Sequence, residues 1–80
     1  MELLGLKVRH ERLGVGMITQ RAGNLIIVTY PARHGKKMRE YISPDAFETE
    51  IEAENIAVQQ AMLDRIREAR AAAQIHSAKK

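Results

Sequence analysis

The sequence predicts a mainly-β protein, in which a small antiparallel barrel of four or five short strands is followed by one long α-helix. Residues 6–42 consist of alternating or β-branched runs separated by glycine-containing turns, whereas residues 45–76 carry apolar side chains at helical spacing. The charge changes at the same point: residues 1–44 hold eight basic and three acidic side chains, and residues 45–80 hold five and seven. We therefore predict a barrel over residues 1–43 and a helical segment with a frayed tail over residues 44–80.

Four segments of the first half have the composition of strands. The first, residues 6–9, alternates apolar with basic side chains, and the strongest, residues 25–30, is rich in β-branched residues. The other two are residues 17–20 and 37–42. Gly14 and Gly16 permit the bulge or sharp bend that a very small barrel needs at its corners. Gly23 supplies the left-handed position of a hairpin turn.

Strand alternation divides the apolar residues of the central hairpin into two faces. The predicted inner set is Ile18, Ile26, Val28 and Tyr30, and the predicted outer set is Val15, Met17, Leu25 and Ile27. Strands that are apolar on both faces are normally covered on both. Either the protein's own helix covers the outer set, or a partner protein binds there.

The second half is predicted as a helix over residues 45–75, which begins at a capping box formed by Asp45 and Glu48. Its apolar stripe contains Phe47, Ile51, Val58, Met62, Ile66, Ala69 and Ala73, and Asn55 falls within the same stripe. A helix of about 30 residues is about 45 Å long, which exceeds the size of a 40-residue barrel. The distal half of this helix therefore either bends back or packs against a partner. If the partner is a second copy of the chain, the protein is a homo-oligomer. A break near Thr49 would separate a short first turn from the long helix.

The first half also contains a recognisable motif. Val8, His10, Gly14, Gly16 and Ile18 form the pattern V-x-H-x-x-L-G-x-G-x-I, and a strand with Val28 and Tyr30 and a turn with Gly35 follow. This pattern resembles the Tudor-type, SH3-like C-terminal domain of UvrD/PcrA-type DNA helicases, although Leu13 replaces the usual Phe. It is more loosely similar to the RNA-polymerase-interacting domain of CarD-type transcription regulators. The resemblance implies an SH3-like barrel. It also implies RNA polymerase as a candidate partner, which the barrel would bind through the edge of a strand.

No arrangement of residues in the sequence predicts catalysis, a metal site or a cofactor. The three histidines, His10, His34 and His76, lack metal-ligand spacing, and there is no cysteine. We expect His10 to form a structural hydrogen bond to the backbone. Gly14 to Gly16 is too short for a dinucleotide fingerprint. The protein is therefore predicted not to be an enzyme.

A second candidate surface is the densest basic run of the chain, which contains Arg33, Lys36, Lys37 and Arg39. Clustered cations release counterions from nucleic acid, so direct nucleic-acid binding is one interpretation and a solvated loop is the other. No aromatic residue lies within the run to stack on bases.

Taken together, these patterns predict a non-catalytic interaction module of the DNA and transcription machinery, which binds a protein through Val15, Met17, Leu25 and Ile27. Direct nucleic-acid binding and a helix-mediated oligomerising adaptor are the alternatives. No run approaches the roughly 20 apolar residues that span a bilayer, and the lack of cysteine fits a cytoplasmic protein.

Overall fold

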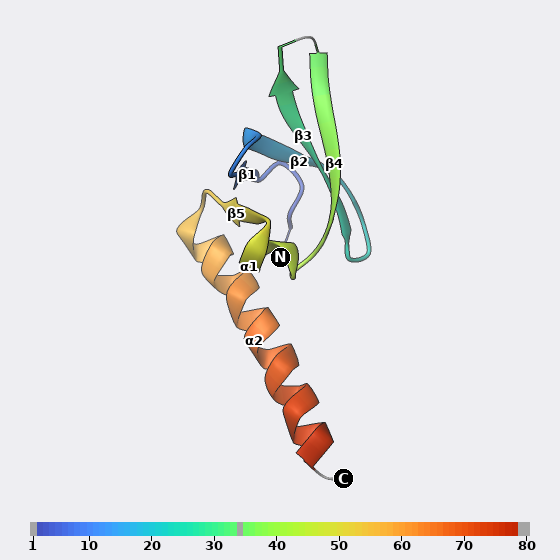
Figure 1. Cartoon of the computed structure of the whole chain (residues 1–80), viewed down its shortest axis with the longest axis vertical. Helices are drawn as coiled ribbons and strands as arrows, with labels where there is room; N and C mark the ends of the chain where they lie inside the picture. Colours follow the sequence, from blue (N-terminus) through green and yellow to red (C-terminus); the bar gives the residue numbers. More distant parts are fainter. Residues whose placement is uncertain (1, 34, 79–80) are drawn as a thin grey trace.

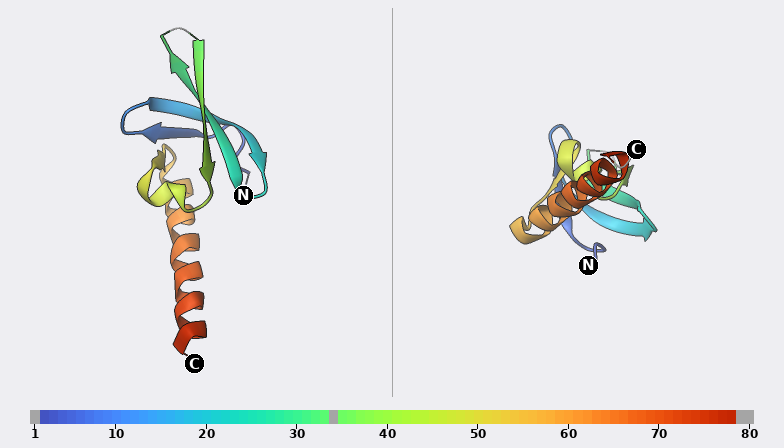
Figure 2. Two further views of the ribbon diagram at one scale, coloured as in Figure 1. Left: turned by 45° about the vertical axis from the view of Figure 1, so that its right-hand side comes forward. Right: turned by 90° about the horizontal axis from the view of Figure 1, so that it is seen from below.

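The protein is elongated, with a small sheet-containing body from which one helix projects (Figures 1 and 2). The computed structural model describes residues 2–33 and 35–78. Its principal extents are 54 × 23 × 21 Å. The predicted class, mainly β with a C-terminal helix, is confirmed.

Five antiparallel strands form one sheet in the order β4-β3-β2-β1-β5. The elements along the chain are β1 (Lys7–His10), β2 (Gly14–Ala22), β3 (Leu25–Ala32), β4 (Gly35–Ile42), α1 (Ala46–Thr49), β5 (Ile51–Ala53) and α2 (Ile56–Ala78). Strands β1 to β4 form a meander of consecutive neighbours, and β5 returns to the free side of β1.

The long strand β2 changes partners along its length. Its first residues pair with β1, from Gly14 opposite His10 to Met17 opposite Lys7. From Met17 onward it pairs with β3, with an irregularity between Ile18 and Gln20. Such bulges bend a strand and increase its twist. Figure 2 accordingly shows β1 and the start of β2 crossing β3 and β4 at a steep angle.

The hydrophobic core lies between the inner side of the sheet and the two helices. It consists of Leu3, Val8, Ile18, Ile26, Val28, Tyr30, Tyr41, Ala46, Phe47, Ile51, Ala53 and Met62. The hydroxyl groups of Tyr30 and Tyr41 form a buried hydrogen bond of 3.0 Å within it. Helix α2 contributes Met62 to this core and also buries Ile66 one turn further on. Among the α2 side chains that the structure describes, the buried ones therefore lie in the first half of the helix, and Arg70 beyond them contacts α1 through Glu48.

The prediction of one continuous helix from residue 45 is wrong at Ile51–Ala53, which form strand β5. Ile51 and Ala53 are buried and Glu52 between them is exposed, which is the two-residue period of a strand. Backbone pairing with β1 places Ile51 opposite His10 and Ala53 opposite Val8. This pairing overrides the helical preference of the Glu- and Ala-rich sequence. The alternative break is confirmed, because α1 ends at Thr49.

The residues at the helix starts differ from those expected. Asn55 caps α2: its side-chain oxygen accepts hydrogen bonds from the backbone N–H groups of Ala57 and Val58, at 2.9 and 3.2 Å. Asn55 therefore does not lie in an apolar seam of α2. Asp45 precedes α1 but forms no capping hydrogen bond through its side chain, so the expected capping box is wrong. Glu48 instead pairs with Arg70 of α2.

Candidate interaction surfaces

The four outer residues predicted for the β2–β3 hairpin lie on the side of the sheet that faces away from the core. Val15 and Met17 are 39% and 41% exposed, whereas Leu25 and Ile27 are half-buried. The predicted inner residues Ile18, Ile26, Val28 and Tyr30 are all buried. The alternation expected from the sequence is therefore present in the structure.

Strand β4 extends this apolar surface. Thr29 of β3 lies opposite Met17 on one side and Met38 on the other, and Leu25 lies opposite Ile42. Met38 is 64% exposed and Ile42 is 54% exposed. We call the set Val15, Met17, Leu25, Ile27, Met38 and Ile42 the outer patch. The two β4 residues could not be predicted as part of this surface, because the outward positions of that strand alternate between charged and apolar side chains.

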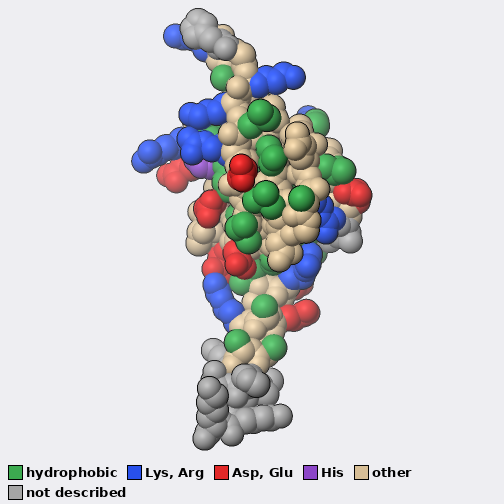
Figure 3. Space-filling model, turned by 90° about the vertical axis from the view of Figure 1, so that its right-hand side faces the viewer, with side chains coloured by type: hydrophobic (Ala, Val, Ile, Leu, Met, Phe, Trp, Pro, Cys, Tyr) green, Lys and Arg blue, Asp and Glu red, His purple; other side chains and the backbone are tan. Residues whose placement is uncertain are grey.

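Helix α2 does not lie across the outer patch. It packs mainly against α1 and β5, and its buried side chains, Met62 and Ile66, face the core and α1. Viewed from the side on which β4 lies in Figure 1, hydrophobic side chains gather in the wide middle of the molecule, with Lys and Arg beside them (Figure 3). In the part of the chain that the structure describes, the protein's own helix therefore does not cover this face, which was the first of the two alternatives.

The basic run forms part of a projecting two-stranded ribbon. β3 and β4 pair from Leu25 opposite Ile42 to Ala32 opposite Gly35, but β2 reaches only as far as Thr29. The backbone of residues 30–33 and 35–37 therefore extends beyond the part of the sheet that β2 pairs with, as Figure 1 shows. Of the predicted nucleic-acid-binding residues, Arg33 lies at the tip and the other three lie on β4. His34 and the side chain of His76 lie outside the part of the chain that the structure describes.

The basic residues of β4 point to different sides of the ribbon. Lys37 lies opposite Tyr30 and Arg39 opposite Val28, so both occupy the inner side. Lys36 lies opposite Pro31 and occupies the outer side. All three side chains are exposed. The structure thus separates residues that the sequence placed in one cluster.

A groove of about 690 Å³ separates Lys37 and Arg39 from the turn between β1 and β2. It is lined by His10, Glu11, Arg12, Leu13, Lys37, Arg39, Thr49 and Glu50. The Nδ1 atom of His10 accepts hydrogen bonds from the backbone N–H groups of Arg12 and Leu13, at 3.0 and 3.1 Å. Its ring meets that of Tyr30 edge to face, with 6.1 Å between centroids. The structural role expected for His10 is confirmed, and it fixes the turn that carries Arg12.

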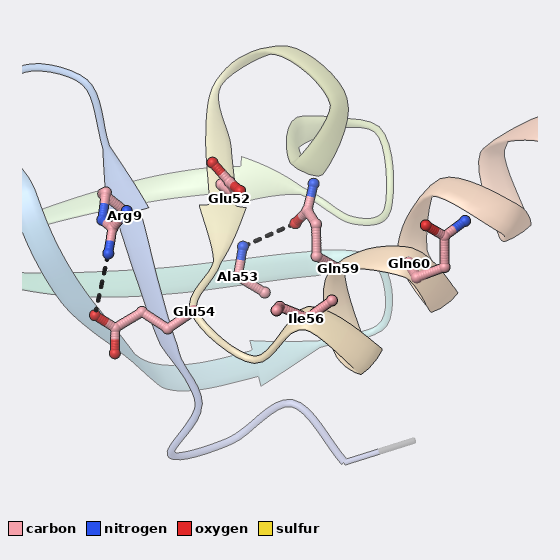
Figure 4. A pocket seen from close by; sticks show the side chains of 7 residues that line it. All are labelled: Arg9, Glu52, Ala53, Glu54, Ile56, Gln59 and Gln60. Atoms are coloured by element: carbon pink, nitrogen blue, oxygen red, sulfur yellow. Dashed lines mark hydrogen bonds and ion pairs between the residues drawn. The ribbon is translucent and has the colours of Figure 1, made fainter.

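A smaller pocket of about 270 Å³ lies beside β5 and the start of α2 (Figure 4). Arg9 and Glu54 form an ion pair of 3.8 Å at its edge. The Gln59 side chain accepts a hydrogen bond from the N–H of Ala53 and donates one to the carbonyl oxygen of Phe47, both at 2.8 Å. The two hydrogen bonds of Gln59 therefore hold α1, β5 and α2 together. Ile56, at the rim, is 85% exposed.

Neither a metal-binding cluster nor a membrane span is found among the residues that the structure describes. No three of their His, Asp or Glu side chains converge as metal ligands would. Their helices are too short or too polar to cross a bilayer.

No protein-family model, curated protein or solved structure matches the chain significantly.

Proposed function

We propose that this chain is a non-catalytic interaction module of the DNA and transcription machinery, which binds a protein partner through the outer patch. The observation that carries the proposal is the exposure of Val15, Met17, Met38 and Ile42 on three adjacent strands, with α2 packed elsewhere. Exposed apolar side chains that gather on one face of a small protein are typical of an interaction site.

The proposed fold is an SH3-like, Tudor-type barrel. Two observations support it: β5 returns to pair with β1 after the four-stranded meander, and the short helix α1 directly precedes β5. RNA polymerase is the candidate partner because the motif around His10, Gly14 and Gly16 resembles domains that bind this enzyme.

Edge pairing is the proposed mode of contact. Strand β4 lies at the end of the sheet, and all its backbone partners among the described strands belong to β3. An extended segment of the partner adds along the free edge, where main-chain hydrogen bonds supply affinity and alternate side chains supply specificity. The partner's apolar side chains then cover Met38 and Ile42 at the edge and Met17 further inward.

The test measures binding of purified RNA polymerase core enzyme to the native chain and to two variants. Removing an apolar anchor of this size costs roughly 1 kcal/mol, so Met17→Gln combined with Met38→Gln is expected to weaken binding by at least about tenfold. The matched control is Ile56→Gln, which removes an exposed apolar side chain outside the patch and is expected to change the affinity less than twofold.

Two results contradict the proposal in different ways. If the native chain does not bind the polymerase, this partner is wrong. If the chain binds and the double variant binds equally well, the outer patch is not the contact surface. Far-UV circular dichroism of each variant verifies that the sheet is intact.

An oligomerising adaptor is the second candidate, because α2 continues to Ala78 while Ile66 is the last buried residue among the α2 side chains that the structure describes. Sedimentation equilibrium of the full chain and of a chain that ends at Arg70 tests it. A dimeric mass that is lost on shortening supports the adaptor, and a monomeric mass for both chains excludes it.

A further inference from the structure

We infer that the projecting β3–β4 ribbon and the facing β1–β2 turn form a binding arm for B-form duplex DNA, separate from the protein contact of the outer patch. The ribbon, described over residues 30–33 and 35–37, is the part of the sheet that extends beyond β2. A two-stranded antiparallel ribbon has dimensions that the major groove of B-DNA admits.

The charge of the ribbon favours a polyanion. Residues 30–39 hold four Lys or Arg side chains and no Asp or Glu. These side chains, Arg33, Lys36, Lys37 and Arg39, are exposed and form no ion pair with any residue in the described ranges. Their positive charge is therefore available to phosphate groups.

A fifth cation faces the ribbon across the groove. Arg12 lines the groove together with Lys37 and Arg39, and the hydrogen bonds from its turn to His10 fix its backbone. Lys37 and Arg39, two residues apart on β4, are separated by about 7 Å along the strand. Cations on both walls of the groove can contact the two phosphate backbones that border a DNA groove.

The aromatic residues distinguish duplex DNA from other nucleic acids. Tyr30, Tyr41 and Phe47 are the three aromatic residues of the chain, and all are at least 94% buried. None can stack on an unpaired base, which is the main contact of single-strand binding proteins. Duplex RNA is disfavoured because its major groove is too deep and narrow for side chains to reach.

Three acidic side chains limit the affinity. Glu11 and Glu50 also line the groove, and Glu40 lies on the outer side of β4 opposite Ile27. We therefore expect contact with the phosphates without base readout, at a Kd on the order of 1–100 μM at physiological salt.

Fluorescence anisotropy with a labelled 20-base-pair DNA duplex tests the inference. Five phosphate contacts predict a slope of about −4.5 for log K against log salt, equal to a loss of roughly 500-fold between 50 and 200 mM. The variant Lys37→Gln with Arg39→Gln is expected to reduce the slope by about 1.8, and Arg12→Gln by about 0.9.

The control is Arg65→Gln with Arg67→Gln, which removes the same charge from α2 and is expected to leave the slope within about 0.5 of the native value. Single-stranded DNA and duplex RNA of the same length are the comparison ligands, and both are expected to bind at least fivefold more weakly. Absence of duplex binding at 50 mM salt, an equal loss in the α2 control, or tighter binding of either comparison ligand overturns the inference. These measurements contain no polymerase, so their outcome is independent of the proposed partner.

Discussion

Gly16 is the position at which a single methyl group is expected to disturb the protein most. Gly16 is buried on the inner side of β2, between the outward residues Val15 and Met17. A Cβ atom added there would lie 2.6 and 2.8 Å from ring atoms Cδ1 and Cε1 of Tyr30, and 2.8 Å from Cγ1 of Val28. Ordinary van der Waals contact begins near 3.4 Å. The variant Gly16→Ala therefore forces β2 and Tyr30 apart.

The neighbours of Gly16 have little room to move. Val28 is 0% exposed and Tyr30 is 1% exposed, and the Tyr30 hydroxyl is held by its hydrogen bond to Tyr41. Overpacking of a close-packed core costs typically 1–3 kcal/mol. We expect Gly16→Ala to lower the free energy of unfolding by about 2 kcal/mol. This loss lowers Tm by roughly 8–16 °C in a domain of this size.

Thermal unfolding followed by far-UV circular dichroism measures this change. Val15→Ala, at the exposed neighbouring position, is the control and is expected to cost less than about 1 kcal/mol. Because Tyr30 supplies two of the three close contacts, Gly16→Ala should cost at least about 1 kcal/mol less in a Tyr30→Leu background. A Tm for Gly16→Ala within about 2 °C of the native value, or strictly additive effects of the two substitutions, would refute the reasoning.

Three further predictions concern the core, the turn and the helix. Burial, and then the hydrogen bond with Tyr41, raise the pKa of Tyr30 above its ordinary value of 10.0, so the folded state retains a proton that the unfolded state loses. Stability is therefore expected to fall as pH rises above about 10, and Tyr30→Phe should flatten this decline in a pH series of urea melts. His10→Ala, which removes the acceptor of two backbone N–H groups, is expected to cost about 1 kcal/mol in the same assay, whereas His10→Asn should recover part of the loss; equal losses would argue against the hydrogen bonds. Ending the chain at Arg70 removes none of the core residues that the structure describes and is expected to shift Tm by less than about 3 °C at micromolar concentration; a larger, concentration-dependent shift would indicate that the distal helix is held by another copy.

The faces of the strands could be predicted from the sequence because side-chain direction in a strand depends only on local alternation. Once Val28 and Tyr30 were assigned to the core, Ile27 had to point outward, and the structure agrees. The structural role of His10 was equally local, since it bonds to N–H groups two and three residues ahead. Local patterns thus determined both the inner and the outer sides of the central hairpin.

Strand β5 carries the same local alternation, but a run this short does not by itself distinguish a strand from the start of a helix. Residues 50–54 alternate Glu with Ile or Ala, a pattern that fits a helix start because acidic residues are favourable near a helix N-terminus. What makes Ile51–Ala53 a strand is the unpaired edge of β1, more than 40 residues earlier in the chain. The cap supplied by Asn55 and the bonds of Gln59 to Phe47 and Ala53 then fix where α2 begins and where it packs. The bonds of Gln59 and the pairing of β5 with β1 join different elements, so only the folded arrangement reveals them.

The position of α2 determines which surfaces of the sheet are available. Because β5 and α1 place the helix start at the open end of the core, Met62 completes the interior from that end and the side of the sheet that bears Met17 stays exposed. Alternation along β4 then places Met38 on the outer side and Lys37 and Arg39 on the inner side. One strand thus gives an apolar contact to one face and a cationic contact to the other.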